Sequence, residues 1–127
     1  MIHQMDVFFL IAVMHVVLIA PLLLFIGFNR AATPEWLYNV IFGLGLLVLV
    51  YHGYRAITRI LASSQLAWIN LIHVFIVAPL LLWIGYYGKR TERPAYDMLL
   101  IAAFGAFGFQ LYRVIVMSQT YVKSHEV

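Results

Sequence analysis

Four long runs of apolar residues constrain this chain more than any other feature. They cover about residues 7–28, 36–61, 66–87 and 96–117. Each run has the length of about 20 residues that an α-helix needs to cross the hydrocarbon core of a bilayer. The runs are continuous and too long for barrel strands, which have about ten residues of alternating polarity. We therefore expect an all-α integral membrane protein with a single transmembrane domain over residues 1–127.

The composition excludes several classes of protein. Hydrophobic residues make up 65% of the chain and charged residues only 10%, against about 25% charged in soluble domains. A soluble globular enzyme and a disordered chain are thereby excluded. The chain has no cysteine, so thiolate metal sites and cysteine nucleophiles are absent. No basic soluble surface exists to bind nucleic acid, and the expected partner is the lipid bilayer.

Acidic residues are few and lie at or beyond the ends of the apolar runs. A carboxylate-based proton pump is therefore disfavoured, because such pumps place carboxylates within the membrane. Since no acid or nucleophile accompanies the histidines, the sequence favours a protein without enzymatic activity. The acidic residues are Asp6, Glu35, Glu92, Asp97 and Glu126.

The connections between the runs are short. Residues 29–34, 62–65 and 88–94 join successive runs, and links of this length make neighbouring helices antiparallel. We expect an up-down-up-down bundle of four transmembrane helices with both termini on one side of the membrane. The sequence does not indicate which side of the membrane the termini occupy, because four Lys or Arg residues fall on each side of the bundle.

The chain contains an internal repeat with a constant offset of 58 positions. The segment His15–Gly27 reads HVVLIAPLLLFIG, and His73–Gly85 reads HVFIVAPLLLWIG. Tyr54-Arg55 and Tyr112-Arg113 match at the same offset. The first repeat covers about residues 7–61 and the second about 66–117. Each holds two helices, so we expect two parallel two-helix repeats related by a pseudo-two-fold axis along the membrane normal.

Two prolines depart from this offset. Pro34 and Pro94 are 60 positions apart, which predicts that the second loop is about two residues longer than the first. The repeat unit combines H-x5-P-L-L-L-x-I-G with a later [YF]-[HQ]-x-Y-R. In these motifs the chain resembles small uncharacterised four-helix membrane proteins associated with large DNA viruses and marine metagenomes. The resemblance implies a compact helical membrane protein and no particular chemistry.

A layer of polar residues lies within one leaflet. Counted at 1.5 Å per residue from the terminal side, His15, His73, His52 and Gln110 lie about 10–13 Å deep, and Gln110 occupies the repeat position of His52. Polar residues at such depth are costly and mark functional sites. The ligand- or ion-binding candidates are His15, His73, His52, Gln110, Tyr54, Tyr112, Arg55, Arg113 and Asn70.

The apolar runs also carry residues that alter helix geometry. Pro21 and Pro79 each remove one backbone hydrogen bond, so we expect helix kinks there and unpaired carbonyls at Val17 and Phe75. Glycines in the second and fourth runs are expected to allow close helix approach or to leave a slot. These are Gly43, Gly45, Gly53, Gly105 and Gly108.

Three functions are compatible with the polar layer. The first is an ion channel or transport protein for protons or small anions, expected to be a homo-oligomer because four helices leave little room for a pore. The second is a membrane protein that binds b-type haem, or another tetrapyrrole or metal, with His15 and His73 as axial ligands. The third is a structural or assembly protein in which the polar layer fixes helix register.

Overall fold

The computed structural model describes residues 2–126; the side chains of residues 2–6, among them Asp6, lie outside the description. Every element in the described part of the chain is helical. The elements are α1 (Ile2–Met14), the π-helical η1 (His15–Ile19), α2 (Ala20–Asn29), the 3₁₀ turn η2 (Arg30–Ala32), α3 (Glu35–Leu61), α4 (Ala67–Ile72), the π-helical η3 (His73–Val77), α5 (Ala78–Tyr87), the 3₁₀ turn η4 (Gly88–Arg90) and α6 (Arg93–His125).

Four helical segments are long and apolar enough to cross a membrane, and they confirm the prediction of an all-helical chain with four such helices. They are Val7–Ala32, Glu35–Leu61, Ala67–Arg90 and Arg93–His125. The last helix continues beyond residue 117, where the apolar run ends, to His125. Its final turns carry exposed polar side chains such as Gln119 and Lys123, so these turns extend past the apolar part of the helix.

The surface of the helices is apolar. Leu10, Val17, Val50, Phe75 and Ile101 each expose between 68% and 73% of their surface. Soluble monomers rarely expose contiguous apolar patches of more than a few hundred Å². Side chains of this kind are stable on a surface that faces hydrocarbon, which is compatible with a multi-pass membrane protein.

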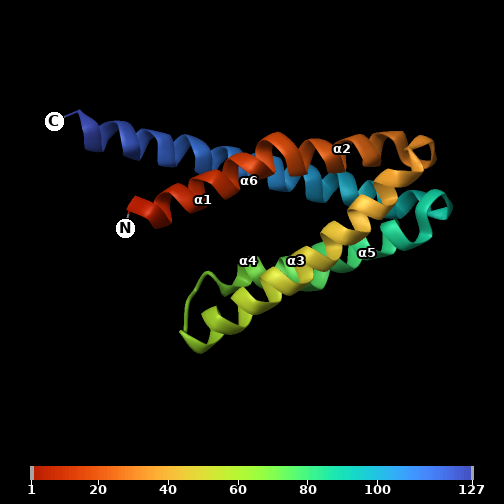
Figure 1. Cartoon of the computed structure of the whole chain (residues 1–127), viewed down its shortest axis with the longest axis horizontal. Helices are drawn as coiled ribbons and strands as arrows, with labels where there is room; N and C mark the ends of the chain where they lie inside the picture. The colour runs from red at the N-terminus through yellow and green to blue at the C-terminus, as the bar shows by residue number, and fades with distance from the viewer. Residues whose placement is uncertain (1, 127) are drawn as a thin grey trace. The chain divides into compact units, whose positions relative to one another are not determined.

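The helices form two compact units. One consists of Met1–Phe25 with Leu100–Val127, and the other of Ile26–Leu99. We call them the terminal unit and the central unit. In Figure 1 the terminal unit contains the red and blue ends of the chain, and the central unit contains α3, α4 and α5.

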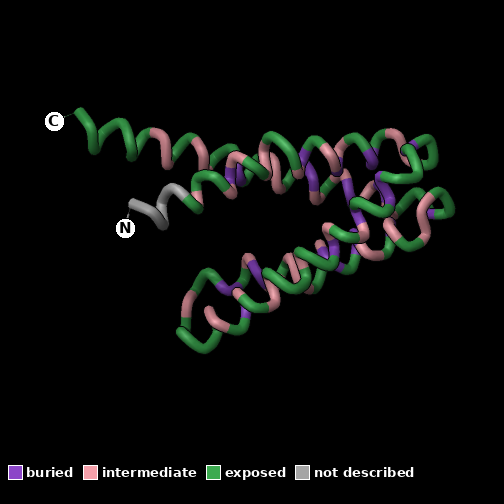
Figure 2. Tube along the Cα trace, in the orientation of Figure 1, coloured by how far each residue is buried: buried purple, intermediate pink, exposed green. Residues whose placement is uncertain are grey.

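In the central unit, α3 packs along α4, η3 and α5 (Figure 1). The buried residues of this unit lie mainly where its helices run beside each other (Figure 2). Two glycines allow the helices to approach closely. A Cβ atom added at Gly85 would lie 2.6 Å from the Cβ and 2.8 Å from the backbone of Phe42, and one added at Gly45 would lie 3.0 Å from Leu82. Of the five glycines noted in the sequence, Gly45 serves close packing, whereas Gly43, Gly53, Gly105 and Gly108 have open space beside them.

The two loops of the central unit have the same geometry. Arg30 and Gly88, 58 positions apart, have positive φ angles of 50° and 57°. Thr33 and Thr91 each donate a side-chain hydrogen bond to the carbonyl seven residues earlier, at Ile26 and Ile84. The Ile84 carbonyl also accepts the Gly88 N–H, so the threonine hydroxyl is a second donor to a carbonyl in the last turn of the helix.

The expected difference in loop length is wrong. α3 begins at Glu35 and α6 at Arg93, and these residues are 58 positions apart, like the rest of the repeat. Pro34 directly precedes its helix, while Pro94 is the second residue of its helix. Both positions tolerate proline, because the first N–H groups of a helix have no intrahelical partner. The two loops therefore have the same length, and only the position of the proline differs.

The two loops also contact each other. The hydroxyls of Tyr38 and Tyr96 lie 2.8 Å apart, and each also reaches a loop carbonyl, at Arg30 (2.8 Å) and at Gly88 (3.2 Å). Because each hydroxyl has one hydrogen, the three contacts share two hydrogens. Lys89 Nζ donates to the carbonyls of Ala31 and Thr33 at 3.1 Å.

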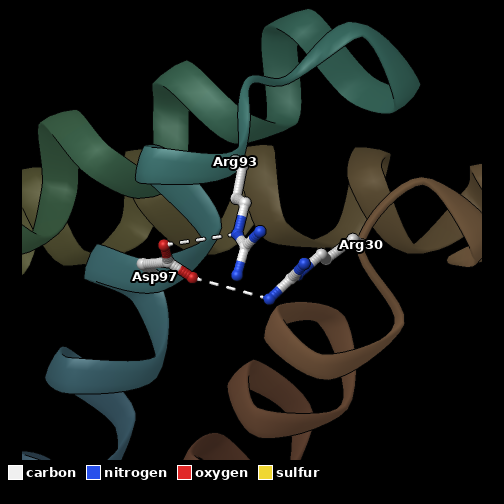
Figure 3. Close-up of polar contacts among 3 residues, drawn as sticks. All are labelled: Arg30, Arg93 and Asp97. Atoms are coloured by element: carbon white, nitrogen blue, oxygen red, sulfur yellow. Dashed lines mark ion pairs between the residues drawn. The ribbon is translucent and has the colours of Figure 1, made fainter.

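An ion-pair network lies beside these loops. Asp97 lies 3.7 Å from Arg30 Nη2 and 3.9 Å from Arg93 Nε, and Figure 3 shows the carboxylate between the two guanidinium groups. All three side chains are at least 41% exposed. Exposed pairs contribute little to stability, so the tyrosine, threonine and lysine hydrogen bonds hold the loops together more than this network does.

We predict that Gly85→Ala destabilises the protein by about 1–3 kcal/mol, the usual cost of overpacking, because the new methyl group meets the backbone of Phe42. Gly43→Ala is the matched control, since its Cβ would enter open space. We expect the control to be neutral, or stabilising by up to about 1 kcal/mol through helix propensity. Unfolding of the detergent-solubilised protein, followed by circular dichroism, measures both. Equal effects of the two substitutions would contradict the prediction.

Candidate functional site

Four polar side chains of the central unit form a connected cluster, which we call the His52–His73 cluster. Arg59 Nη1 donates to Asn70 Oδ1 at 2.6 Å, and Asn70 Nδ2 lies 2.8 Å from His52 Nδ1. The rings of His52 and His73 are stacked, with centroids 4.0 Å apart and planes 13° apart. Asn70 is 3% exposed. Residues from α3, α4 and η3 are thus joined within one apolar unit.

Helix geometry explains why these residues meet. The turn at residues 62–65 reverses the chain, so residues of α3 and α4 at similar distances from this turn lie opposite each other. His52 and Arg59 are seven residues apart, which is two turns of one helix face. Asn70 and His73 are three residues apart and share a face of the next helix. His52 and His73, which the sequence placed at similar depth, are thus in direct contact in the structure, and Asn70 contacts His52.

The hydrogen bonds assign the neutral tautomers of both rings. Because arginine only donates, Asn70 must present Oδ1 to Arg59 and its amide N–H to His52. Nδ1 of His52 is therefore an acceptor, and the proton of the neutral ring is on Nε2. His73 Nδ1 lies 2.7 Å from the carbonyl of Ile69, which only accepts. His73 therefore carries its proton on Nδ1 and a lone pair on Nε2.

Each repeated histidine begins a π-helical turn that ends just before a proline. In η3 the Ala78 N–H donates to the carbonyl of His73, five residues earlier. Pro79 has no N–H, so the Val74 carbonyl receives neither an i+4 bond from Ala78 nor an i+5 bond from Pro79. η1 repeats the pattern, with Ala20 donating to His15. The π turns thus add the carbonyls of Val16 and Val74 to those of Val17 and Phe75 as backbone acceptors that lack the usual i+4 donor.

The terminal unit holds the other two members of the predicted polar layer. His15 Nδ1 lies 2.7 Å from the carbonyl of Ile11, the same bond that His73 makes with Ile69. Gln110 is 7% exposed, and its Oε1 accepts no hydrogen bond from the described residues. This oxygen is the one buried side-chain acceptor without a partner in the described part of the chain.

The remaining predicted site residues lie elsewhere on their helices. Tyr54 is 67% and Tyr112 66% exposed, so both side chains point away from the interior of their units. Arg55 and Arg113 are half-buried, and the guanidinium of Arg113 lies 5.9 Å from the centre of the Phe109 ring. Among the described residues, no three histidine or acidic side chains come together as a metal site.

Sequence reasoning missed Arg59 as a member of the site. A signal was present, since Arg59 lies two helical turns from His52 and is separated from Asn70 only by a tight reversal of the chain. The prolines are the only feature of the sequence that points to the π-helical turns. Comparison with protein-family models, curated proteins and solved structures finds no match.

We predict that Asn70→Leu destabilises the protein by about 1–3 kcal/mol, the cost of removing one partner from buried polar groups. The substitution removes the acceptor of Arg59 and a donor to His52 at once. Asn39→Leu makes the same change at an exposed position of α3 and should stay within about 0.5 kcal/mol of the original. The ¹⁵N chemical shift of His52 Nδ1 should move only in the Asn70 variant; an unchanged shift would contradict the hydrogen bond.

Proposed function

We propose that this chain is a multi-pass protein of the lipid bilayer that conducts or transports ions, with protons as the ion that its polar groups fit best. The observation that carries the proposal is the stacked pair of His52 and His73. Imidazole is the side chain whose unperturbed charge change falls between pH 5 and 8. A pair of such rings in an apolar unit is a means to hold and release a proton.

The two rings are suited to different steps. His73 can take a proton on Nε2 while its Nδ1–H bond to Ile69 is kept. His52 would have to take a proton on Nδ1, where Asn70 donates, and the amide cannot turn over without losing its bond to Arg59. The cluster thus favours His73 as the ring that takes up a proton on Nε2 and releases it from the same nitrogen, while His52 keeps its Nε2 proton and supplies a neutral ring stacked on His73. Protonation of both rings would place two positive charges about 4 Å apart, beside Arg59.

Small anions are the other ions that the cluster could serve. Arg59, which donates to Asn70 and to the carbonyl of Leu66, brings a positive charge to the cluster, and Arg55 lies one helical turn away. Proton passage requires groups that donate and accept hydrogen bonds, and each imidazole ring has one nitrogen of each kind. We therefore rank protons above anions.

We further propose that the two halves of the sequence are copies of one two-helix unit in the same membrane orientation, related by a pseudo-two-fold axis. Two contacts support this. Tyr38 meets Tyr96, and Lys89 meets the carbonyl of Ala31, and both pairs are 58 positions apart. Contacts between equivalent positions are expected close to such an axis. Passage of ions then requires further copies, so a homo-oligomer is part of the proposal.

Binding of haem b is a second candidate, and one observation favours it. His15 and His73 each direct Nδ1–H to a carbonyl one turn earlier, which leaves Nε2 as the ligating nitrogen. Metal-ligating histidines are usually oriented in this way. His15 and His73 belong to different units, so their use as a pair of axial ligands stays a prediction from the sequence.

We predict that His73→Phe lowers proton flux by about 100-fold or more, the lower end of what positioned proton-transfer groups contribute. Phenylalanine keeps an aromatic ring to stack on His52 but has no nitrogen. The measurement uses liposomes that contain the purified protein and a pH-sensitive dye, with a potassium gradient and valinomycin to drive the protons.

His125→Phe is the matched control, because it makes the same change at an exposed ring near the end of α6. We expect its flux to equal that of the unchanged protein. An unchanged flux in His73→Phe contradicts the proposed role of the ring. Chloride flux without proton flux would favour the anion alternative, and neither flux would favour a structural or assembly role.

The haem candidate has its own test. If His15 and His73 ligate haem b, the purified protein or the protein after addition of haem shows a Soret band typical of a low-spin haem with two histidine ligands. His15→Ala and His73→Ala should each remove this spectrum. A protein that stays colourless and takes up no haem contradicts this candidate and leaves the proton proposal untouched.

A further inference from the structure

We propose that a groove in the central unit binds one phosphatidylethanolamine molecule of the bilayer, with the ammonium group of the lipid at Glu92 and an acyl chain along α5. The proposal rests on the placement of the chain in a bilayer, which is part of the proposed function, and it is independent of proton conduction. It assigns a lipid partner to a surface that the His52–His73 cluster does not use.

The groove itself is the first observation. It has a volume of about 440 Å³ and lies between η3 and α5 on one side and the first turns of α6 on the other. Its described lining residues are apolar except for Glu92, and they include Phe75, Pro79, Trp83 and Met98. Binding sites for small molecules typically have about 300–1,000 Å³, mostly apolar walls and a few polar groups that fix the ligand. The groove has this composition, with one carboxylate as its polar group.

The direction of the groove is the second observation. Glu92 lies between the candidate spans Ala67–Arg90 and Arg93–His125, at the level of the lipid headgroups in the proposed placement. Trp83 lies on α5 near this end, and Phe75 lies eight residues earlier, about 12 Å further along the helix. The charged end and the apolar length of the groove therefore follow the same order as the headgroup and the acyl chain of a lipid in that leaflet.

The third observation is which charges of the loops are paired within the protein. Asp97 lies between Arg30 and Arg93 (Figure 3). Glu92 and Arg90 are exposed, and neither side chain makes a hydrogen bond or an ion pair with a described residue. The end of the groove thus has one carboxylate, and one guanidinium two residues before it in the chain, that are available to a ligand.

These two charges favour a zwitterionic headgroup with a primary amine. The Glu92 carboxylate only accepts hydrogen bonds, and a primary ammonium group has three N–H donors. Hydrogen bonds between charged groups are about twice as strong as those between neutral groups. The quaternary ammonium of phosphatidylcholine has no N–H, and phosphatidylglycerol has no cation. The phosphate of the same headgroup complements Arg90, because a guanidinium matches the geometry of phosphate oxygens.

Tryptophan fluorescence tests the site, because Trp83 lines the groove. The chain has three tryptophans, so Trp36→Phe combined with Trp68→Phe leaves Trp83 as the single reporter. The matched reporter keeps only Trp36, which is exposed to a similar extent (64% against 55%) and does not line the groove. Each protein is reconstituted in phosphatidylcholine liposomes that contain one lipid with brominated acyl chains, since bromine quenches tryptophan on contact. The brominated lipid is phosphatidylethanolamine, phosphatidylcholine or phosphatidylglycerol.

We expect phosphatidylethanolamine to bind at Trp83 about two- to fivefold more tightly than phosphatidylcholine, the factor that one exposed ion pair provides. At Trp36 we expect no preference between these two lipids. Glu92→Gln should remove the preference at Trp83. Glu35→Gln is the matched control and should retain it, because Glu35 is an exposed carboxylate of the central unit that does not line the groove.

A second pair of variants tests the space rather than the charge. Ala95 lines the groove, so Ala95→Leu places additional atoms inside it and should lower the quenching of Trp83 by brominated phosphatidylethanolamine at least twofold. Ala102→Leu makes the same change at another half-buried alanine of α6, outside the groove, and should leave the quenching unchanged.

Several results would overturn the site. An equal preference at Trp83 and Trp36, or a preference that persists in Glu92→Gln, contradicts it. Quenching of Trp36 without quenching of Trp83 also contradicts it and indicates that protein, such as a second copy of the chain, covers the groove. A preference for phosphatidylglycerol that Arg90→Gln removes contradicts the amine headgroup.

The same liposomes separate this proposal from the proposed function. If neither tryptophan is quenched, the placement in the bilayer fails and the lipid site fails with it. If the tryptophans are quenched with the expected preference but no proton flux is found, proton conduction is contradicted and the lipid site stands.

Discussion

The structure depends on one constraint: a polar group within helices that are apolar on nearly all sides costs free energy unless a hydrogen-bond partner satisfies it. The histidines meet it by donating Nδ1–H to the carbonyl one helical turn earlier, at Ile11 and Ile69. This bond holds the ring and selects its tautomer at the same time. The tautomers of His15 and His73 are therefore set by their own helices, whereas that of His52 is set by Asn70 on a neighbouring helix.

The sequence predicted the four helices, because runs of this length and polarity have one stable form in a membrane. It also predicted a similar depth for His52 and His73, since depth follows from counting residues along a helix. The ring stacking, the role of Arg59 and the π turns could not be predicted in this way. They depend on how a helix is rotated about its axis, which the run of apolar residues leaves open because its hydrophobicity is nearly the same on all sides. The need for glycine at position 85 could not be predicted from the sequence either. It follows from the close approach of Phe42 in the structure.

The constant offset of 58 separates what the two halves share from what they do not. They share the π turns, the histidine bonds, the positive φ angles of Arg30 and Gly88, and the threonine bonds of the loops. All of these are local and are determined by residues within about two helical turns. The differences are at Ala12 and Asn70, and at Gln110 and His52, where the partners come from different helices. Local geometry is thus repeated, while the contacts between helices have diverged.

This divergence gives the two units different chemistry. In the central unit the hydrogen bonds from Arg59 through Asn70 to His52 occupy Nδ1 of His52, so in the proposed function His73 is the ring that takes up the proton. In the terminal unit the amide is replaced by a methyl group and the imidazole by a glutamine that cannot titrate. His15 is the one histidine that this unit contributes to the predicted polar layer. The stacked pair of imidazoles on which the proposed function rests therefore belongs to the central unit, whereas the terminal unit has a single imidazole at the equivalent positions.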